Sequence, residues 1–475
     1  MSAISGWRAV RGAGTLRPRI SSTTKETAVR PRDPHPPPVR RGRSRRAAAL
    51  SLGAVLSGTL LVSCGSEGQQ TTEAGVPILN WYINPDSGGQ QEIAARCTEA
   101  SGGRYALEVE TLPNNPQGQR EQLVRRLVAG DSSVDLMSLD PPFIPEFATA
   151  GFFAPVPPEV EEQFSEQTLA GALEGASYDG ELVTVPFFAN TQLLWYRKSV
   201  AEEAGLDMSQ PVTWDQIIEA AEQTGTTVGV QGTAAESMTV WVTALVRSQG
   251  GEVLANPEAP AEEIEVSIDG PEGAEAARIM RAIADAGVGG PQLSTADEDA
   301  TAALFESEAG GFMVNWPFVW ARAQSFVEAG SMEQETLDDY GWTLYPRVTE
   351  DDEPATPYGG INIGVGAFSE RPELAYEAAT CIASPENQQY YFLSNGNPPS
   401  AAAAFEGQEV LDQYPMAPTI EESVELAAPR PQTPYYDVVS TGIQRTWRPG
   451  SADPQTTPAA SAELIRQVLQ GEALL

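Results

Sequence analysis

The chain has 475 residues, a formal net charge of −36, three cysteines and a single histidine, His35. Histidine is the usual general base near neutral pH and the commonest metal ligand. Its absence after residue 35 therefore excludes Ser-His-Asp and Cys-His catalysis and histidine-ligated zinc from the rest of the chain. No GxxxxGK phosphate loop followed by Ser or Thr is present. Enzymes that use only carboxylates, such as glycosidases, are not excluded.

Residues 1–63 have the pattern of an export signal. A basic block at 40–46 precedes an apolar run at 47–63, which ends in Leu-Val-Ser before Cys64. This order is typical of a secretory signal peptide, and the run is short for a membrane span. The end of the run resembles the bacterial lipobox, which implies lipidation of Cys64 and anchoring at the outer face of the cell membrane. An ordinary secretory signal or a short anchor helix is the alternative. Residues 64–75 are expected to form a flexible tether.

The charge divides at the same boundary. Residues 1–63 hold 12 of the 29 Lys and Arg and 2 of the 65 Asp and Glu, so residues 64–475 carry a net charge of −46 and a single lysine, Lys198. A surface this acidic repels nucleic acid, and we expect no nucleic-acid partner.

Two cysteines remain if Cys64 carries lipid. An exported chain is found where disulfides persist, so we expect a Cys97–Cys381 bridge. Two buried free thiols are the alternative.

Strand and helix patterns alternate from residue 76 onward. This βαβ order predicts a mostly parallel sheet with helices on both faces, and ligands bind beyond the carboxyl ends of such strands. Asp140 stands at one of these ends. The predicted strands are 77–83, 105–112 and 134–139, and the helices between them are 90–100 and 117–128.

Capping signals place the later helices. Thr213 and Gln216 form a capping box for a helix that ends at Thr224, and Ser384 with Pro385 begins another that stops at Asn395. No internal repeat and no second apolar stretch long enough for a bilayer is found. The other predicted elements are helices at 271–287, 302–307, 372–381 and 461–470 and a strand at 311–316.

Three sequence blocks carry a resemblance to a known family. They are Asn-Thr-Gln-Leu-Leu-Trp-Tyr-Arg at 190–197 with Val-Thr-Trp-Asp at 212–215, Phe-Glu-Ser-Glu-Ala-Gly-Gly-Phe-Met-Val-Asn-Trp-Pro at 305–317, and Tyr-Gly-Gly-Ile-Asn-Ile at 358–363. Through them, residues 76–475 are similar to extracellular solute-binding proteins of ABC sugar importers, family 1. The 190–197 block, Leu-Met-Ser-Leu-Asp at 136–140 with 146–151, and Arg-Pro-Gln-Thr-Pro-Tyr-Tyr at 430–436 further resemble trehalose-binding lipoproteins of actinobacteria.

This resemblance implies a two-lobed α/β periplasmic-binding-protein fold. Each lobe is expected to be a mostly parallel sheet flanked by helices, and a hinge joins the lobes. We expect lobe one at 76–187 plus 317–358 and lobe two at 188–316 plus 359–475. Cys97 and Cys381 would then lie in different lobes, and their bridge would have to lie beside the hinge.

A sugar needs particular side chains. Its vicinal hydroxyls suit carboxylate, amide and guanidinium groups, and its C–H face suits an aromatic ring. Asp140, at a strand end, is the first candidate, with a helix cap or a turn residue before Pro141 as its alternative role. Asn190 matches the sugar-binding asparagine of the family, with a hinge turn as its alternative. Trp316 is expected to stack on the sugar or to belong to the core, and Arg430 to fork onto two hydroxyls or to form a surface salt bridge.

Weaker candidates are placed by position alone. Solvated faces, a solvated acidic run and a plain turn are the alternatives for several of them. These candidates are Asn84, Asp86, Gln119, Gln122, Glu298 and Gly360.

The resemblance implies a monomeric, lipid-anchored binding protein that closes on a disaccharide, trehalose, and delivers it to permease subunits. It implies no catalytic residue, no metal and no cofactor. A lipid-anchored glycosidase with two carboxylates, and a binding protein for maltose-type or other oligosaccharides, are the alternatives.

Overall fold

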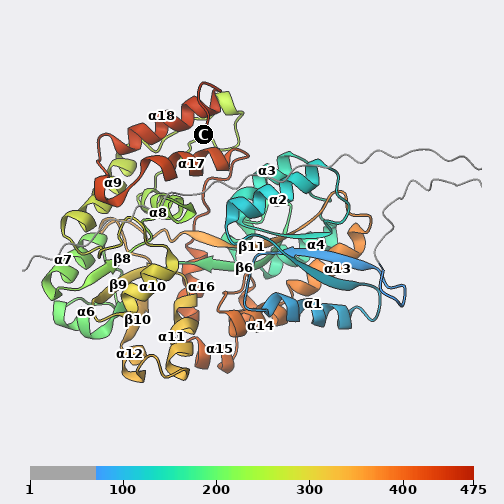
Figure 1. Ribbon diagram of the computed structural model, residues 1–475, viewed down its shortest axis with the longest axis horizontal. Coiled ribbons are helices and arrows are strands. Elements are labelled where there is room, and N and C mark those ends of the chain that lie inside the picture. Colours follow the sequence, from blue (N-terminus) through green and yellow to red (C-terminus); the bar gives the residue numbers. More distant parts are fainter. Residues whose placement is uncertain (1–70) are drawn as a thin grey trace, which may run out of the picture. The chain divides into compact units, whose positions relative to one another are not determined.

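The computed structural model describes residues 71–475 (Figure 1). The expected signal segment 1–63 and Cys64 lie outside the described residues. Residues 71–75, the end of the expected tether, form a turn in which Thr71 bridges to Pro77 and the Gly75 amide donates to the Thr72 carbonyl. This part of the tether is therefore folded against the start of the first strand. None of the described helices combines the length and apolarity that a membrane crossing requires.

One five-stranded sheet has the order β2-β1-β3-β11-β6. Its strands are β1 (Ile78–Ile83), β2 (Ala106–Thr111), β3 (Leu136–Leu139), β6 (Val185–Thr191) and β11 (Tyr358–Val365). As the βαβ pattern predicts, β1 runs parallel to β2 and β3, whereas β11 runs antiparallel to both β3 and β6.

The second sheet has the order β10-β7-β9-β8. Its strands are β7 (Leu193–Arg197), β8 (Thr227–Gly229), β9 (Gly310–Asn315) and β10 (Tyr340–Thr343), and a separate hairpin joins β4 (Ser177–Tyr178) and β5 (Glu181–Leu182). Only the β8–β9 pair is parallel here, so the expectation of a mostly parallel sheet is wrong for these strands. The reason is that β7 continues directly from β6 after one residue, Gln192, and its neighbours run in the opposite direction.

Helices cover both faces of each sheet (Figure 1). Two apolar clusters flank the first sheet, one with α1 (Gly89–Ala100), α4 (Pro158–Gln167), α13 (Pro372–Ile382) and α14 (Pro385–Asn395), the other with α2 (Pro116–Val128) and α3 (Ile144–Thr149).

The second sheet is also packed on two sides. One cluster receives α6 (Lys198–Ala204), α7 (Trp214–Thr224), α8 (Glu236–Arg247), α9 (Pro271–Asp285), α17 (Tyr436–Thr446) and α18 (Thr457–Leu469). The other receives α5 (Ala170–Glu174), α10 (Glu298–Glu306), α11 (Phe318–Glu328), α12 (Gln334–Asp338), α15 (Gln408–Gln413) and α16 (Ala417–Glu425).

The helix caps follow the sequence signals. The Thr213 hydroxyl accepts from the Gln216 amide and the Gln216 side chain accepts from the Thr213 amide, which is the predicted capping box. Ser384 caps α14, and that helix ends at Gly396 with a φ of 72°. These local signals depend on a few neighbouring residues, which is why a single sequence suffices to find them.

Strand pairing differs from the expected division of segments in two places. β10, expected in lobe one, pairs with β7 of the second sheet, and most of β11, expected in lobe two, pairs with β3 and β6 of the first. The hinge crossings therefore do not fall where the sequence blocks end. The lobe limits themselves stay a prediction.

Cys97 and Cys381 are joined by a disulfide, with their Cα atoms 5.8 Å apart. Cys97 belongs to the apolar cluster on the first sheet, and Cys381 packs against the same cluster. The expectation that the two cysteines lie in different lobes is therefore wrong, because α13 returns to pack on the first sheet beside α1. A bridge inside one cluster does not restrict movement between the sheets.

A buried set of hydroxyls ties together segments that connect the two sheets. Thr191 ends β6 and bonds to the Thr356 hydroxyl at 2.5 Å and the Ser423 hydroxyl at 2.8 Å. The Thr356 hydroxyl also donates to the carbonyl of Gln192, between β6 and β7. This cluster lies at the crossing from one sheet to the other, where a hinge would have to bend.

Candidate functional site

Strand register brings several predicted residues to one edge of the first sheet. β1 and β3 are parallel, so Asn84 and Asp140 follow their carboxyl ends on the same side. β11 and β6 are antiparallel, and Asn190 lies opposite Gly359, next to Gly360. The edge therefore presents amide and carboxylate side chains from three strands beside a glycine-rich strand.

A cavity of about 310 Å³ opens at this edge. Four of its lining residues, Asn84, Asp86, Asn190 and Trp316, are predicted ligand residues. Its volume is at the lower end of the range for small-molecule sites, and its lining combines aromatic rings with amides. The remaining lining residues are Pro85, Ser87, Phe318, Asn395 and Asn397.

Trp316 comes to the cavity from the second sheet. It follows β9 directly, and its backbone amide donates to the Asn315 side chain at 2.9 Å. A Cβ atom at Gly359 would lie 3.1 Å from the Trp316 ring, so the ring packs closely over the backbone of β11. The ring is half-buried and lines the cavity, so one surface remains for a ligand.

The loop after β1 combines a cap with unused hydrogen-bonding capacity. Asp86 accepts from the amides of Gly88 and Gln90 and so begins α1. Oδ1 of Asn84 and Oε1 of Gln90 are buried and have no hydrogen-bond partner within residues 71–475. Unpaired buried polar atoms also occur elsewhere in residues 71–475, for example at Gln192 and Trp241, and Asn84 is of interest because it lines the cavity, where a ligand could supply the donor.

Asp140 and Arg430 bind each other. Nη2 of Arg430 donates to Oδ1 of Asp140 at 2.5 Å, and Nη1 donates to Oε1 of Glu236 at 2.6 Å. The Arg430 side chain is only 4% exposed. The alternative of a surface salt bridge for Arg430 is therefore wrong, because the ion pair is buried. Asp140 does stand at the N-cap position of the turn Pro141–Phe143, where its carbonyl accepts from the Phe143 amide, but its side chain makes no capping bond.

Glu236, the first residue of α8, is the centre of this ion cluster. It accepts hydrogen bonds from Nε2 of Gln117 at 3.1 Å, from the Ser440 hydroxyl at 2.7 Å and from the Tyr436 hydroxyl, in addition to Arg430. These donors come from α2, from α17 and from the segment before α17. Glu236 thus joins segments that pack on both sheets.

Burial and charge shift the pKa values within the ion cluster. Burial raises the pKa of Asp140, and the charge of Glu236 raises it further, although Arg430 opposes both. Burial alone would lower the pKa of Arg430, but Asp140, Tyr436 and Glu236 together raise it well above its usual value. Arg430 therefore stays protonated, and Asp140 takes up a proton more readily than an exposed aspartate.

Glu298 connects the ion cluster with the cavity. Its carboxylate accepts from the Ser237 hydroxyl at 2.8 Å, and its carbonyl accepts from the Asn315 side chain at 3.0 Å. Ser237 follows Glu236, and Asn315 precedes Trp316. Glu298 therefore supports both parts from the side of the second sheet instead of lying in a free acidic run.

The other predicted residues have different surroundings. Nε2 of Gln119 donates to the Pro113 carbonyl at 2.8 Å, so this side chain holds its own loop. Gln122 is half-buried on α2, and it lines neither the cavity nor the ion cluster. Gly360 has a φ of 117°, and a Cβ there would lie 2.2 Å from the Phe188 carbonyl, so the backbone itself requires glycine.

Sequence reasoning missed Gln117, Glu236, Asn395 and Asn397. Glu236 opens the apolar helix α8, where an acidic residue is common for purely local reasons. Asn395 and Asn397 surround Gly396, which marks only a helix end by its pattern. For the ion cluster, the sequence offered one signal, since Tyr436 lies in the same 430–436 block as Arg430 and could have been predicted to lie near it.

The arrangement can hold an uncharged, hydroxyl-rich molecule. Amides, an indole ring and the Asp86 carboxylate line the cavity, and Asp86 accepts from the backbone amides of Gly88 and Gln90. Within residues 71–475, no group of His, Cys, Asp or Glu is placed to hold a metal ion.

Comparison with known proteins agrees with this geometry. The sequence pattern of the bacterial extracellular solute-binding proteins matches residues 83–389, more than half of the chain. The chain belongs to this family. A probable ABC transporter-binding protein of Deinococcus radiodurans is 22% identical over 266 residues, which cover 54% of this chain and 60% of that protein. The chain thus spans 60% of the length of this curated relative, less than two thirds.

Solved structures share the two-lobed fold of this family member. Maltose-bound MalE3 of T. maritima has a TM-score of 0.69 at 24% identity, covering 83% of this chain and all of that one. A solute-binding protein of Agrobacterium vitis with bound D-mannitol has a TM-score of 0.64 at 19% identity, covering 83% and 97%. At such identities the likeness establishes the fold alone.

Proposed function

We propose that this solute-binding protein is the sugar-binding component of an ABC importer and that its ligand is a disaccharide, trehalose. The cavity lined by Asn84, Asn190 and Trp316 carries this proposal. Two amides and an indole ring match vicinal hydroxyls and the C–H face of a pyranose. The relatives named for an ABC transporter and the sugar-bound neighbours support the transport role.

The ligand is captured by closure of a hinge. The cavity takes Asn84 and Asn190 from the edge of the first sheet and Trp316 from the end of a strand in the second. A ligand that contacts all three stabilises the closed arrangement over the open one, because only the closed form makes both sets of contacts. The closed, loaded form then binds the permease.

The ion cluster positions the polar side of the site. Arg430 holds Asp140 through Oδ1, and Oδ2 of Asp140 has no hydrogen-bond partner within residues 71–475. Asp140 does not line the cavity at Trp316, and we propose that this oxygen accepts from a sugar hydroxyl when the lobes close on the ligand. The cluster contains two carboxylates and one guanidinium, so an anionic sugar is disfavoured and a neutral one is accepted.

Titration calorimetry with trehalose, maltose and mannitol tests this function. We expect micromolar binding of trehalose, about −8 kcal/mol, because cargo must also be released. Trehalose at 100 times its dissociation constant should stabilise the protein by roughly 2.7 kcal/mol in thermal unfolding. Tighter binding of maltose or mannitol would replace trehalose as the cargo and leave the binding role intact.

Incubation with trehalose separates binding from hydrolysis. Release of free glucose by the purified protein would establish the glycosidase alternative instead. Asp86 lines the cavity but already accepts from two backbone amides, and Asp140 and Glu236 are both paired with Arg430, so we expect no glucose.

We further propose that lipid on Cys64 holds the protein at the outer face of the cell membrane. The lipobox-like sequence supports this. Mass spectrometry of the protein extracted from membranes should find an acylated cysteine at the new N-terminus. Cys64→Ala should appear in the soluble fraction, and equal membrane retention of that variant would contradict the anchor.

A further inference from the structure

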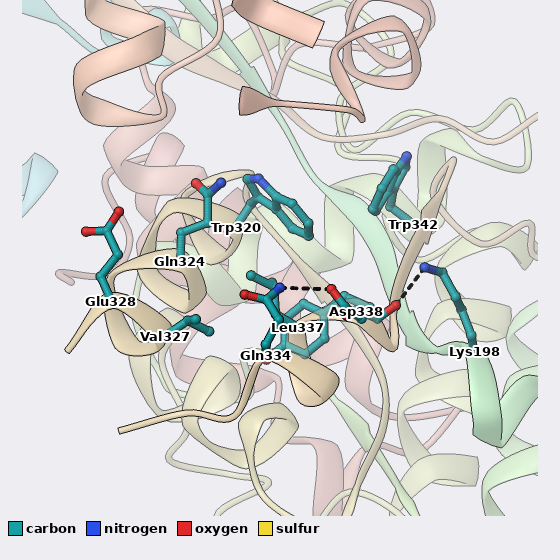
Figure 2. Close-up of a pocket in the computed structure, with 10 residues that line it drawn as sticks. Lys198, Trp320, Gln324, Val327, Glu328, Gln334, Leu337, Asp338 and Trp342 are labelled. Atoms are coloured by element: carbon teal, nitrogen blue, oxygen red, sulfur yellow. Dashed lines mark hydrogen bonds between the residues drawn. The ribbon is translucent and has the colours of Figure 1, made fainter. Parts of the chain in front are cut away.

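A second cavity, of about 540 Å³, lies on the far side of α11 from the proposed sugar site. Phe318, at the start of α11, lines the first cavity, whereas Trp320 and Gln324 of the same helix line the second. The rest of its wall comes from the end of α11, from α12, from β10 and from Lys198. Figure 2 shows these side chains, with Trp320 and Trp342 beside each other and Lys198 next to Trp342.

The two indole rings form an aromatic corner. The centroids of Trp320 and Trp342 are 5.6 Å apart and their planes meet at 74°. Trp320 is fixed because its indole nitrogen donates to the Gln413 carbonyl at 2.7 Å. Trp342 lies on β10, the edge strand of its sheet, and both rings are half-buried. Such a corner leaves part of each ring exposed toward the cavity, where a ligand can stack on it.

Planar polar groups surround this corner. The Gln334 amide donates to Asp338 at 2.8 Å, and Lys198 donates to the Asp338 carbonyl at 2.9 Å (Figure 2). Gln324 adds a second amide to the lining. Stacking faces beside amides, a carboxylate and an ammonium group are the chemistry that recognises a pyranose ring.

Charge argues against an anionic ligand. Lys198 is the only lysine after the leader in a chain segment with a net charge of −46. Glu328 and Asp338 line the same cavity. An anion would therefore meet a negative field, whereas a neutral saccharide would not.

We propose that the cavity between α11, α12 and β10 is a second saccharide site, with Trp320 and Trp342 as its stacking platform. It binds short neutral saccharides independently of the site at Trp316. Because the polar groups Lys198, Gln334 and Asp338 of this cavity are exposed to solvent, its affinity is millimolar, weaker than that of the first site.

Tryptophan indole signals in NMR of the ¹⁵N-labelled full chain test the proposal, with trehalose and maltotriose as the probes. Assignments come from single Trp→Phe variants. We expect the Trp316 signal to move at low sugar concentration and those of Trp320 and Trp342 at concentrations at least tenfold higher. Trp316→Ala removes the Trp316 signal itself, and the changes at Trp320 and Trp342 should remain at the same sugar concentrations. Trp342→Ala should abolish the change at Trp320 and leave the calorimetric dissociation constant of the first site unchanged.

Gln334 is exposed, so the variant Gln334→Ala provides a second test that leaves the folded core unchanged. It should raise several-fold the sugar concentration that is needed to move the Trp320 and Trp342 signals. The proposal is overturned if the Trp320 and Trp342 signals stay still at tens of millimolar sugar. It is equally overturned if the Trp320 and Trp342 signals move only at the concentrations that move Trp316, and no longer move in Trp316→Ala. It is also overturned if the cation tetramethylammonium moves these two signals and sugars do not, because the aromatic corner would then be a cation site. The Trp316 signal reports the proposed function separately.

Discussion

The cavity at Trp316 and the ion cluster at Arg430 both contain residues from one edge of the first sheet, yet the protein uses them differently. In the cavity, Asn84 keeps a buried acceptor without a partner. In the cluster, Glu236 alone accepts from four side chains, Arg430, Gln117, Tyr436 and Ser440. The cavity is lined by a residue with an unpaired buried acceptor, whereas the cluster pairs its charges with one another, although Nε of Arg430 stays without a partner there.

This difference separates binding from stability. An unpaired buried polar group costs the empty protein free energy that a ligand can recover. A paired and buried ion cluster instead fixes the positions of its members, and removal of one partner leaves the others uncompensated. Substitutions in the two regions should therefore have opposite effects on stability and affinity.

The largest effect is expected at Arg430. Arg430→Met leaves Asp140 and Glu236 buried without their cation and should lower the free energy of unfolding by about 3–5 kcal/mol. Urea denaturation of the ligand-free protein measures this. Arg430→Lys keeps the positive charge but cannot donate to both carboxylates as the guanidinium does, and it should lower the free energy of unfolding by less.

The matched control removes all three charges together. Asp140→Asn with Glu236→Gln and Arg430→Met should recover most of the stability, because no uncompensated charge remains. A single Arg430→Met variant as stable as the unaltered protein would mean that the cluster does not hold the fold, and the comparison would fail.

Trp316→Ala should act on binding. Loss of a central stacking ring should weaken trehalose binding by about 2 kcal/mol, a roughly 30-fold rise in Kd. Trp342→Ala, which removes a half-buried ring on the other side of α11, is the control and should leave this Kd unchanged. Equal losses in the two variants would show that the effect is on folding and not on contact with the sugar.

The sequence predicts local features of this fold well. The first three strands, the helices between them and the capping box at Thr213 agree with the structure to within about two residues, because apolar periodicity and caps depend on near neighbours. The directions in the second sheet and the placement of β10 and β11 could not be predicted in the same way. They depend on where the chain crosses between sheets, which no local pattern records.

The site shows the same division. Asn84 could be predicted because it follows a strand end, where ligands gather, whereas the family resemblance predicts Asn190. Glu236 could not, because its role comes from Arg430, which is 194 residues away in sequence. A buried ion pair is a property of tertiary packing, and an isolated glutamate at a helix start carries no mark of it.

Asn84→Ala sharpens the comparison further. It removes the buried acceptor that has no partner, so the empty protein should be unchanged or slightly more stable while sugar affinity falls by about 1–2 kcal/mol. Thermal unfolding and calorimetry of the same sample measure both quantities.

Asn80 supplies the control for Asn84. It is buried four residues earlier on β1, and its amide nitrogen already donates to the Ser133 carbonyl at 3.1 Å. Asn80→Ala should reduce stability and leave affinity unchanged. If Asn84→Ala lowers stability and leaves affinity unchanged, while Asn80→Ala lowers affinity, Asn84 does not belong to the site.

The smallest effect is expected from pH, where the two regions meet at Asp140. Burial raises the pKa of Asp140 above the ordinary value of about 3.9. The ionised carboxylate accepts sugar hydroxyls and the protonated form loses an acceptor, so affinity is full above the raised pKa and falls as pH decreases through it. Calorimetry between neutral pH and pH 4 should show a several-fold rise in Kd in the unaltered protein. Asp140→Asn, which binds no proton there, should bind more weakly but without this dependence. If Asp140→Asn keeps the same pH profile, another group causes the dependence. Asp140 would then belong to the ion cluster and would not contact the sugar.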